Sequence, residues 1–405
     1  MALSTAHSRA VSLGAQKLAQ AQSLLGPSGL DAWLIVVRES ADRPDPSLRF
    51  FMSQDFTWTS YFLITSAKSL ALVAEFDAPD LRAAGLLDDV RTYREGSKAA
   101  LEAMLREVDP LRIGINTSLH DALSDGLTAG LRDALLESLQ GTPYAARLMS
   151  AESLQARLRG IKLPEEQRLL RRAIEVTEAI FAEVGRSLRV GMEAREVASR
   201  FHEAADRAGV PTAWPRGHCP TVTIGATAAV GHVSPGPERI THGCIVHTDF
   251  GIVLGGYCSD LQRLWYVADK GEADAPDEVC RAYDAIVAGI ELGARALKPG
   301  TVGWEVDQAV RLHLTAMGYP EYGHALGHHL GRHVHDGGGV LGPRWERYGT
   351  EPFRRVEEGN VFTLEPSLQL PGHGVVSLEE DVVVMPRGGE FLSRLPRELP
   401  ILTLD

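Results

Sequence analysis

The chain has 405 residues, more than one ordinary domain holds, so its length predicts two domains. Its apolar share of 44% and charged share of 23% are those of a globular protein. A net charge of −12 argues against binding to nucleic acid or to an acidic membrane surface. The lack of any apolar run of about eighteen residues argues against a membrane span.

Four cysteines are few for this length, and no two of them have the CxxC spacing of a metal or redox motif. The N-terminal residues lack the uninterrupted apolar segment of a signal peptide. These features predict reduced thiols and a cytoplasmic location.

Residues 1–158 alternate short apolar runs with stretches of helical periodicity. The predicted strands are 31–37, 61–65, 70–76 and 112–116, and the predicted helices are 5–25, 78–87, 96–107 and 123–139. This alternation is typical of a small α/β domain, and we find no catalytic signature in it.

Residues 159–405 follow another pattern, in which a pair of helices precedes a strand hairpin and the arrangement then repeats. The predicted helices are 164–184, 192–208, 276–297 and 303–317, and the predicted hairpins are 245–266 and 361–384. Helices and strands grouped in this way predict an α+β domain.

The first hairpin carries two aspartates, Asp249 and Asp260, at equal distances from a turn at 254–256. In a regular hairpin they would be cross-strand neighbours, with Cβ atoms about 4.5–5.5 Å apart. Two carboxylates this close, flanked by apolar side chains, repel each other unless a cation lies between them. The pair therefore predicts a site for divalent metal; the alternative is an exposed turn with solvated aspartates.

The second hairpin offers a matching pair, since Glu365 and Glu379 are symmetric about Gly372. Together the two hairpins would bring four carboxylates from apolar strands to one place. A charge of about −4 is balanced by two divalent cations, and without metal such a cluster is costly to bury.

The segment between the hairpins, residues 323–339, is rich in histidine. Its members are His324, His328, His329, His333 and His335. Imidazole suits Mn, Co, Zn or Fe among carboxylate ligands and shuttles protons near neutral pH. The alternative is an exposed metal-sticky tract, but such a tract has no need of the glycines that interleave here with leucines.

The order and spacing of these residues resemble the pita-bread metallopeptidases (family M24), in the branch of prolidases and Xaa-Pro aminopeptidases. The resemblance covers about residues 160–405 and implies a pita-bread catalytic domain, of the creatinase and methionine aminopeptidase kind, behind a creatinase-type N-terminal domain. It implies two divalent ions per chain, with Mn²⁺ preferred over Co²⁺, Zn²⁺ or Fe²⁺. The implied metal ligands are Asp249, Asp260, His328, Glu365 and Glu379.

By the same resemblance, a metal-held water attacks a peptide bond and Glu365 acts as the general base. His232, His324 and His335 are expected to line the pocket and to stabilise the intermediate. No role carries over to the remaining histidines near the site, which we interpret as structural: His247, His329 and His333.

Two positions depart from the family pattern. Gln369 stands where the family usually has tyrosine, and Ser377 stands where it usually has arginine. Neither is an implied ligand, so metal binding should survive. The departures bear on how the glutamates are oriented and how the end of the substrate is held.

The resemblance implies a small peptide substrate with proline at P1′, and no nucleic-acid or membrane partner. An Xaa-Pro dipeptidase is favoured over an aminopeptidase P, and a homodimer is expected. Arg344, Arg347 and Arg354 are candidates for binding the substrate carboxylate. A methionine aminopeptidase, a non-catalytic binding protein and a metal-free amidinohydrolase are disfavoured, the last two because all five ligands are kept.

Overall fold

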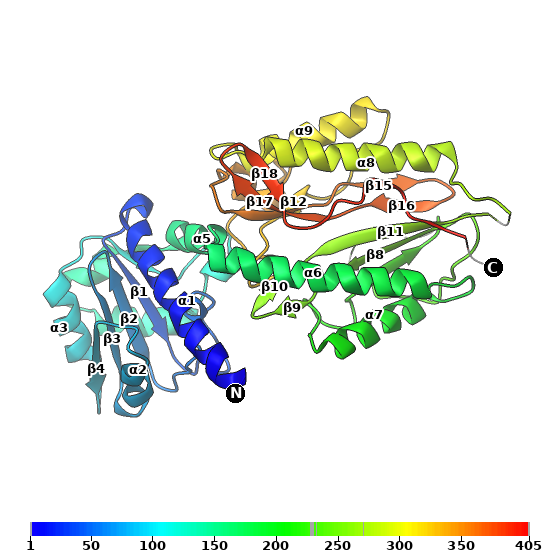
Figure 1. The fold of residues 1–405 in the computed structure, drawn as a ribbon. Coiled ribbons are helices and arrows are strands. Elements are labelled where there is room, and N and C mark those ends of the chain that lie inside the picture. The colour runs from blue at the N-terminus through cyan, green and yellow to red at the C-terminus, as the bar shows by residue number, and fades with distance from the viewer. Residues whose placement is uncertain (1, 227–230, 232, 270, 404–405) are drawn as a thin grey trace. The chain divides into compact units, whose positions relative to one another are not determined.

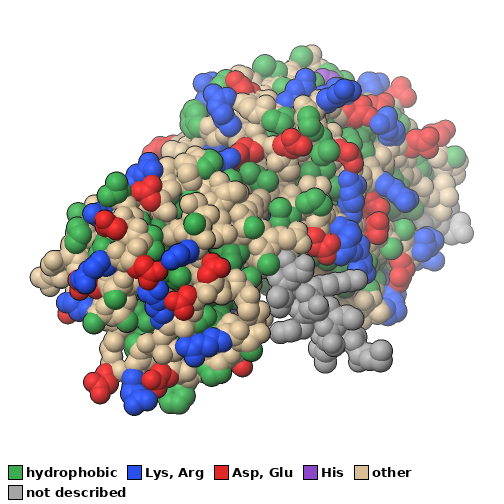
Figure 2. Space-filling model, turned by 60° about the vertical axis from the view of Figure 1, so that its left-hand side comes forward, with side chains coloured by type: hydrophobic (Ala, Val, Ile, Leu, Met, Phe, Trp, Pro, Cys, Tyr) green, Lys and Arg blue, Asp and Glu red, His purple; other side chains and the backbone are tan. Residues whose placement is uncertain are grey.

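The computed structural model describes residues 2–226, 231, 233–269 and 271–403. The chain divides into two compact units, Met1–Arg159 and Gly160–Asp405 (Figure 1). The four cysteines form no disulfide, and among the described residues no helix is both long and apolar enough to cross a bilayer. On the face shown in Figure 2, basic and acidic side chains are interspersed.

The first unit is built on one mixed sheet with strand order β4-β3-β2-β1-β5-β6. Its strands are β1 (Ala32–Val37), β2 (Ser60–Thr65), β3 (Ser69–Ala74), β4 (Asp89–Tyr93), β5 (Ile113–Ile115) and β6 (Leu148–Ser150). Its helices are α1 (Ala2–Leu24), α2 (Ala78–Ala84), α3 (Lys98–Val108), α4 (Ala129–Ser138) and α5 (Glu152–Gly160). The central strands are buried on both faces, which explains why they read as unbroken apolar runs.

The second unit contains two helix pairs and several short sheets, as the repeated pattern predicted. The helices are α6 (Pro164–Ser187), α7 (Ala194–Ala208), α8 (Asp277–Ala296) and α9 (Gly303–Ala316). The strands are β7 (Thr221–Ile224), β8 (Ile245–Phe250), β9 (Val253–Leu254), β10 (Tyr257–Cys258), β11 (Leu261–Val267), β12 (Gly327–His328), β13 (Val340–Leu341), β14 (Val361–Leu364), β15 (Ser367–Leu370), β16 (Gly374–Ser377), β17 (Glu380–Met385), β18 (Gly388–Phe391) and β19 (Ile401–Leu402).

Each helix pair packs beside the hairpin that follows it in sequence. Helix α6 contacts β9, β10 and β11, and α7 contacts β7, whereas α8 contacts β14, β15, β16 and β18 (Figure 1). The first hairpin belongs to the sheet β19-β11-β8-β7, and the second to β14-β17-β18 and the pair β15-β16. Two similar halves thus present strands to a shared interior, and the predicted α+β class is confirmed.

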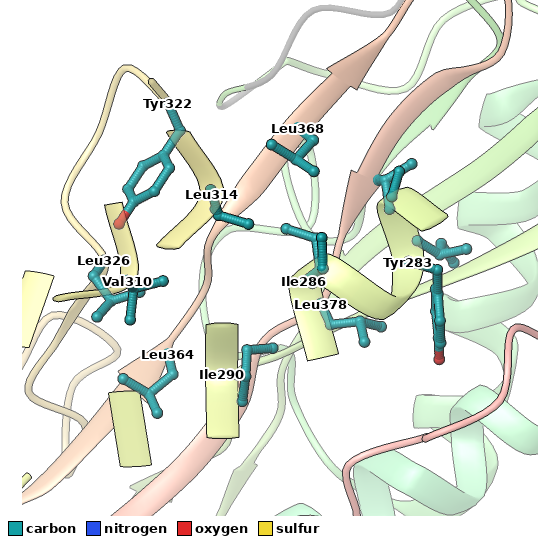
Figure 3. Packing of buried hydrophobic residues seen from close by; sticks show 14 of the residues in the cluster. Tyr283, Ile286, Ile290, Val310, Leu314, Tyr322, Leu326, Leu364, Leu368 and Leu378 are labelled. Carbon is teal, nitrogen blue, oxygen red and sulfur yellow. The ribbon is translucent and has the colours of Figure 1, made fainter. Parts of the chain in front are cut away.

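The apolar core of the second unit lies between α8, α9 and the second hairpin (Figure 3). Ile286 and Ile290 of α8 are fully buried there, as are Leu364 and Leu378 of the hairpin. Since Leu364 and Leu378 immediately precede Glu365 and Glu379, the same packing that anchors the leucines fixes the strand ends that carry the glutamates.

Replacing Ile290 by alanine should destabilise the second unit by about 2–5 kcal/mol, because a fully buried side chain leaves a cavity. Chemical denaturation should show a lower unfolding midpoint. Leu312→Ala is the matched control: Leu312 lies on α9 but is 60% exposed, so its loss should change stability by less than about 0.5 kcal/mol. Equal effects of the two substitutions would contradict this account of the core.

Candidate metal centre

The first hairpin places Asp249 and Asp260 close together, but not directly opposite each other. Residue Asp249 of β8 pairs with Gln262 of β11, so the prediction of a direct cross-strand pair was wrong. The cause is the turn, which comprises only Gly255 and Gly256, with φ values of 61° and 82°. Such a two-residue turn needs positive φ at both positions and moves the register away from the predicted pairing.

The two aspartates are nevertheless diagonal neighbours across the hairpin, close enough for each carboxyl group to affect the pKa of the other. Asp260 immediately precedes β11, and its backbone N–H lies 3.4 Å from Oδ2 of Asp381. The predicted pairing of Asp249 with Asp260 is therefore corrected, but the prediction that their carboxylates lie close together holds.

In the second hairpin the predicted symmetry is confirmed. Leu364 pairs with Glu380 on one side of the glutamates, and Ser367 pairs with Ser377 on the other. This constant register puts Glu365 opposite Glu379. The two strands separate at that point, where the glutamate N–H groups donate instead to the carbonyls of Leu326 and Gln262.

His328 ends the short strand β12 and reaches the carboxylates from a third direction. Its Nε2 lies 3.5 Å from Oε1 of Glu365, 3.7 Å from Oδ2 of Asp260 and 3.9 Å from Oε1 of Glu379. The approach depends on Gly327, because a Cβ there would lie 1.9 Å from the carbonyl oxygen of Thr363. A glycine is thus required for β12 to pass this close to β14.

Burial and mutual repulsion make these carboxylates reluctant to ionise. Burial raises the pKa of Asp249 to about 7. Burial, with neighbouring carboxylates adding to it, raises the pKa values of Asp260, Glu365 and Glu379 well above their usual range. A cation at the centre would reverse this effect by favouring the charged forms.

The donor set fits a divalent metal. Ligand atoms from Asp260, His328 and Glu379 all lie within 4.8 Å of one another, and atoms bound at about 2.1 Å to one cation are roughly 3–4 Å apart. Among the described residues, no hydrogen-bond donor serves Oδ1 of Asp249, Oδ1 of Asp260 or Oε1 of Glu379. Buried carboxylate oxygens without a donor are what a metal ion would satisfy.

A buried ion pair shapes the loop that follows His328. Nζ of Lys162 lies 3.0 Å from Oδ2 of Asp336, and both side chains are 1% exposed. The second Asp336 oxygen accepts the N–H of His333. The sequence analysis missed this pair, which holds the loop in a shape that brings the ring of exposed His335 to 4.4 Å from that of His328.

The other predicted histidine positions differ in their surroundings. His324 is half-buried, with its Nε2 2.7 Å from Oγ of Ser367. His329 is buried against the ring of Phe362, which agrees with a structural role. His232 lies outside the described residues.

The neighbour of Glu379 that could have been mistaken for a ligand has other partners. Glu380 forms an ion pair with Arg263 at 2.9 Å and accepts a hydrogen bond from Ser393. Of these two adjacent glutamates, Glu379 is therefore the one that faces His328.

One residue beside the carboxylates was missed by the sequence analysis. Gln262 is 7% exposed, and its Nε2 donates to Oε2 of Glu365 over 3.3 Å. Ser377, one of the two departures from the family pattern, donates to Oε1 of Gln262 over 2.7 Å. Gln369, the other departure, is exposed. Gln262 could have been noticed from its place two residues after Asp260, which puts it on the same face of the strand.

The three predicted substrate arginines lie in or next to the loop before the second hairpin. Arg344 stacks over the ring of Trp304, and Arg347 donates to the carbonyl of Gly323 over 2.6 Å. Arg354 forms a 3.4 Å ion pair with Glu351. Arg347 is exposed and lines an open hollow together with Gly323, the residue that precedes His324 in the chain.

Comparison with known proteins agrees with this geometry. The model of metallopeptidase family M24 matches residues 168–386, more than half of the chain. The uncharacterized peptidase YqhT of Bacillus subtilis (strain 168) is 30% identical over 258 residues, which cover 62% of this chain and 67% of that protein.

Solved structures share the fold across both units. An Xaa-Pro dipeptidase from Bacillus anthracis has a TM-score of 0.72 at 23% identity, covering 96% of this chain and 100% of that one. An X-Pro aminopeptidase from Thermotoga maritima MSB8 has a TM-score of 0.69 at 23% identity, covering 96% and 99%.

The expected pita-bread architecture is thereby confirmed. The family match spans all five carboxylate and histidine residues of the cluster. Both the sequence match and the arrangement of these side chains lead to one conclusion: the chain belongs to metallopeptidase family M24.

Proposed function

We propose that this chain is a dinuclear metallopeptidase that hydrolyses the Xaa-Pro bond of small peptides, acting as an Xaa-Pro dipeptidase. The observation that carries the proposal is the buried cluster of four carboxylates and one imidazole, whose unserved oxygens fit divalent cations. Its proposed ligands are Asp249, Asp260, His328, Glu365 and Glu379. Mn²⁺ is the proposed metal, since the mixed carboxylate and imidazole set accepts it.

Divalent ions at this site would lower the pKa of bound water and polarise a substrate carbonyl. The protein's own contribution is to hold the ligands and to move a proton. Glu365 is suited to that second task because its side chain is 20% exposed, whereas that of Glu379 is 1% exposed. A carboxylate at the open side of the cluster can take a proton and pass it to the leaving amine.

Three histidines are proposed to bind the substrate. His335 is exposed and stands edge-on to the ring of His328, so it can meet a peptide entering the cluster. His324, four residues before His328, is hydrogen-bonded to Ser367 and is proposed to position the substrate. His232 keeps the role of stabilising the oxyanion as a proposal from resemblance.

The proline preference and the dipeptide limit rest on the relatives. The two structural neighbours are named as an Xaa-Pro dipeptidase and an X-Pro aminopeptidase, which differ in substrate length. A dipeptidase needs a cation for the proline carboxylate. Arg347 is the best placed of the three candidate arginines, because it lines the hollow next to His324, where it also donates to the carbonyl of Gly323. Arg344 stacks over Trp304, and Arg354 pairs with Glu351.

Thermal unfolding of the metal-free protein should depend on pH in a definite direction. The pKa of Asp249 is about 7 in the folded chain and about 4 when unfolded, so the folded form holds the extra proton between these values. This stabilising contribution is complete below about pH 4 and is lost as the pH rises through about 7. Mn²⁺ replaces the proton, so it should raise the melting temperature more at pH 8 than at pH 6.

The control is His328→Ala, which removes a ligand and leaves every carboxyl in place. This variant should keep the pH trend of the metal-free protein but lose most of the shift caused by Mn²⁺. At about 100 times the dissociation constant, one bound ion adds about 2.7 kcal/mol. An Mn²⁺ shift that is the same at both pH values would contradict the buried-carboxylate account.

Substrate length is tested by hydrolysis of Ala-Pro, Ala-Pro-Ala and Met-Ala-Ser with Mn²⁺ and then with chelator. The proposal predicts metal-dependent cleavage of Ala-Pro and at most weak cleavage of the two tripeptides. Preference for Ala-Pro-Ala would contradict the dipeptidase proposal and indicate an aminopeptidase P activity instead. Failure to cleave any of the three would refute the proline inference.

Glu365→Gln supplies the matched control for the same assay. The amide keeps the size of the side chain but cannot accept the proton, so kcat should fall by about 10²–10⁴-fold while the circular dichroism spectrum is unchanged. Normal turnover in this variant would remove Glu365 as the base.

A further inference from the structure

A chain of buried polar side chains leads away from Glu365 through three neighbouring strands. It passes from Gln262 of β11 to His247 of β8 and then to Thr223 of β7, with Ser377 of β16 joining at Gln262. Each of these four side chains belongs to a residue that is less than one-tenth exposed. Buried polar groups linked in this way are either fully satisfied or costly, so their arrangement is under strong constraint.

The hydrogen bond to Glu365 sets the orientation of the Gln262 amide. The NH₂ group of Gln262 donates to Oε2 of Glu365 over 3.3 Å, and the carboxylate of a metal ligand accepts there. Oε1 of Gln262 then faces the other way and needs donors. Ser377 Oγ, at 2.7 Å, and His247 Nε2, at 3.1 Å, are in place to donate to it.

The same argument places a proton on His247. The amide oxygen of Gln262 can only accept, so the ring nitrogen that faces it, Nε2, carries a proton. Oγ1 of Thr223 lies 3.3 Å from Nδ1, where a hydroxyl can either donate or accept.

Gln262 also touches the cluster through its backbone. Its carbonyl oxygen accepts the N–H of Glu379 at 3.3 Å, and it is the cross-strand partner of Asp249. One residue is thus connected to three of the five proposed ligands. Its side chain is neutral, so it can restrain Glu365 without adding a charge that would compete with a bound cation.

We infer that Gln262 is a positioning residue, which holds the Glu365 carboxylate in orientation and is itself held by Ser377 and His247. Ser377 stands where the resemblance predicts an arginine, and in this chain it serves Gln262. The inference rests on the proposed function, because it gives Gln262 its effect through Glu365 as ligand and base.

The test compares Gln262→Met and Ser377→Ala with the wild-type chain. Methionine has a similar length but cannot make either hydrogen bond of the amide. Because loss of such a partner weakens a metal site by about 10–100-fold, Gln262→Met should raise the Mn²⁺ dissociation constant at least tenfold in calorimetry. At saturating Mn²⁺ it should lower kcat by a similar factor and change KM less than about twofold. Ser377→Ala should act in the same direction with a smaller effect.

Gln308→Met is the matched control, since Gln308 lies exposed on α9. It should leave both the Mn²⁺ affinity and kcat unchanged. A second comparison uses the Glu365→Ala background, where Gln262→Met should change the affinity for the remaining Mn²⁺ less than about twofold. A purely structural role for Gln262 would give equal losses in both backgrounds.

The outcomes separate this inference from the proposed function. Wild-type chain that binds Mn²⁺ and cleaves Ala-Pro, with Gln262→Met behaving identically, overturns the positioning role alone. Wild-type chain that binds no Mn²⁺ overturns both. If Gln262→Met does not fold, the smaller change Ser377→Ala is taken through the same two backgrounds, and unchanged affinity in both overturns the inference.

Discussion

The main constraint on the second unit is the repulsion among the carboxylates that its two hairpins bring together, because this repulsion must be compensated for the unit to stay folded. Asp249, Asp260, Glu365 and Glu379 lie on or next to largely buried strands, so solvent relieves little of their charge. The raised pKa values follow directly from this placement. A fold that keeps four such groups together needs protons or cations, and with His328 among them the arrangement selects cations that accept both oxygen and nitrogen.

The packing around the cluster serves to hold it against that repulsion. Leu364 and Leu378 anchor the strand ends from the side of α8, while Gly327 lets His328 approach from β12. The buried Lys162–Asp336 ion pair holds the loop that follows His328 in place. Removing one partner of that pair would leave an uncompensated buried charge in the loop that carries His335.

Sequence spacing predicted much of this arrangement, for reasons that can be stated residue by residue. The second hairpin keeps one register from Val361 to Val383, so symmetry about Gly372 placed Glu365 opposite Glu379 correctly. The same reasoning failed in the first hairpin, because Gly255 and Gly256 form a shorter turn than the one assumed. Spacing fixes which residues share a hairpin, but the type of turn decides which of them are directly opposite.

Partners that come from distant elements were out of reach of the sequence. His247 was interpreted as structural, yet it is joined to Glu365 through Gln262. Lys162 and Asp336 are 174 residues apart and meet only in the fold. Such contacts carry no periodicity, and only the position of Gln262 on the same strand face as Asp260 gave any signal.

The central claim is that divalent cations neutralise this carboxylate cluster. Its most direct test is the number of Mn²⁺ ions that the metal-free chain takes up, measured by calorimetry and by elemental analysis. The account predicts two ions per wild-type chain and none at the same concentrations in the double variant Asp260→Asn, Glu379→Gln. Uptake by the double variant equal to that of wild type, or no uptake by wild type, would contradict it.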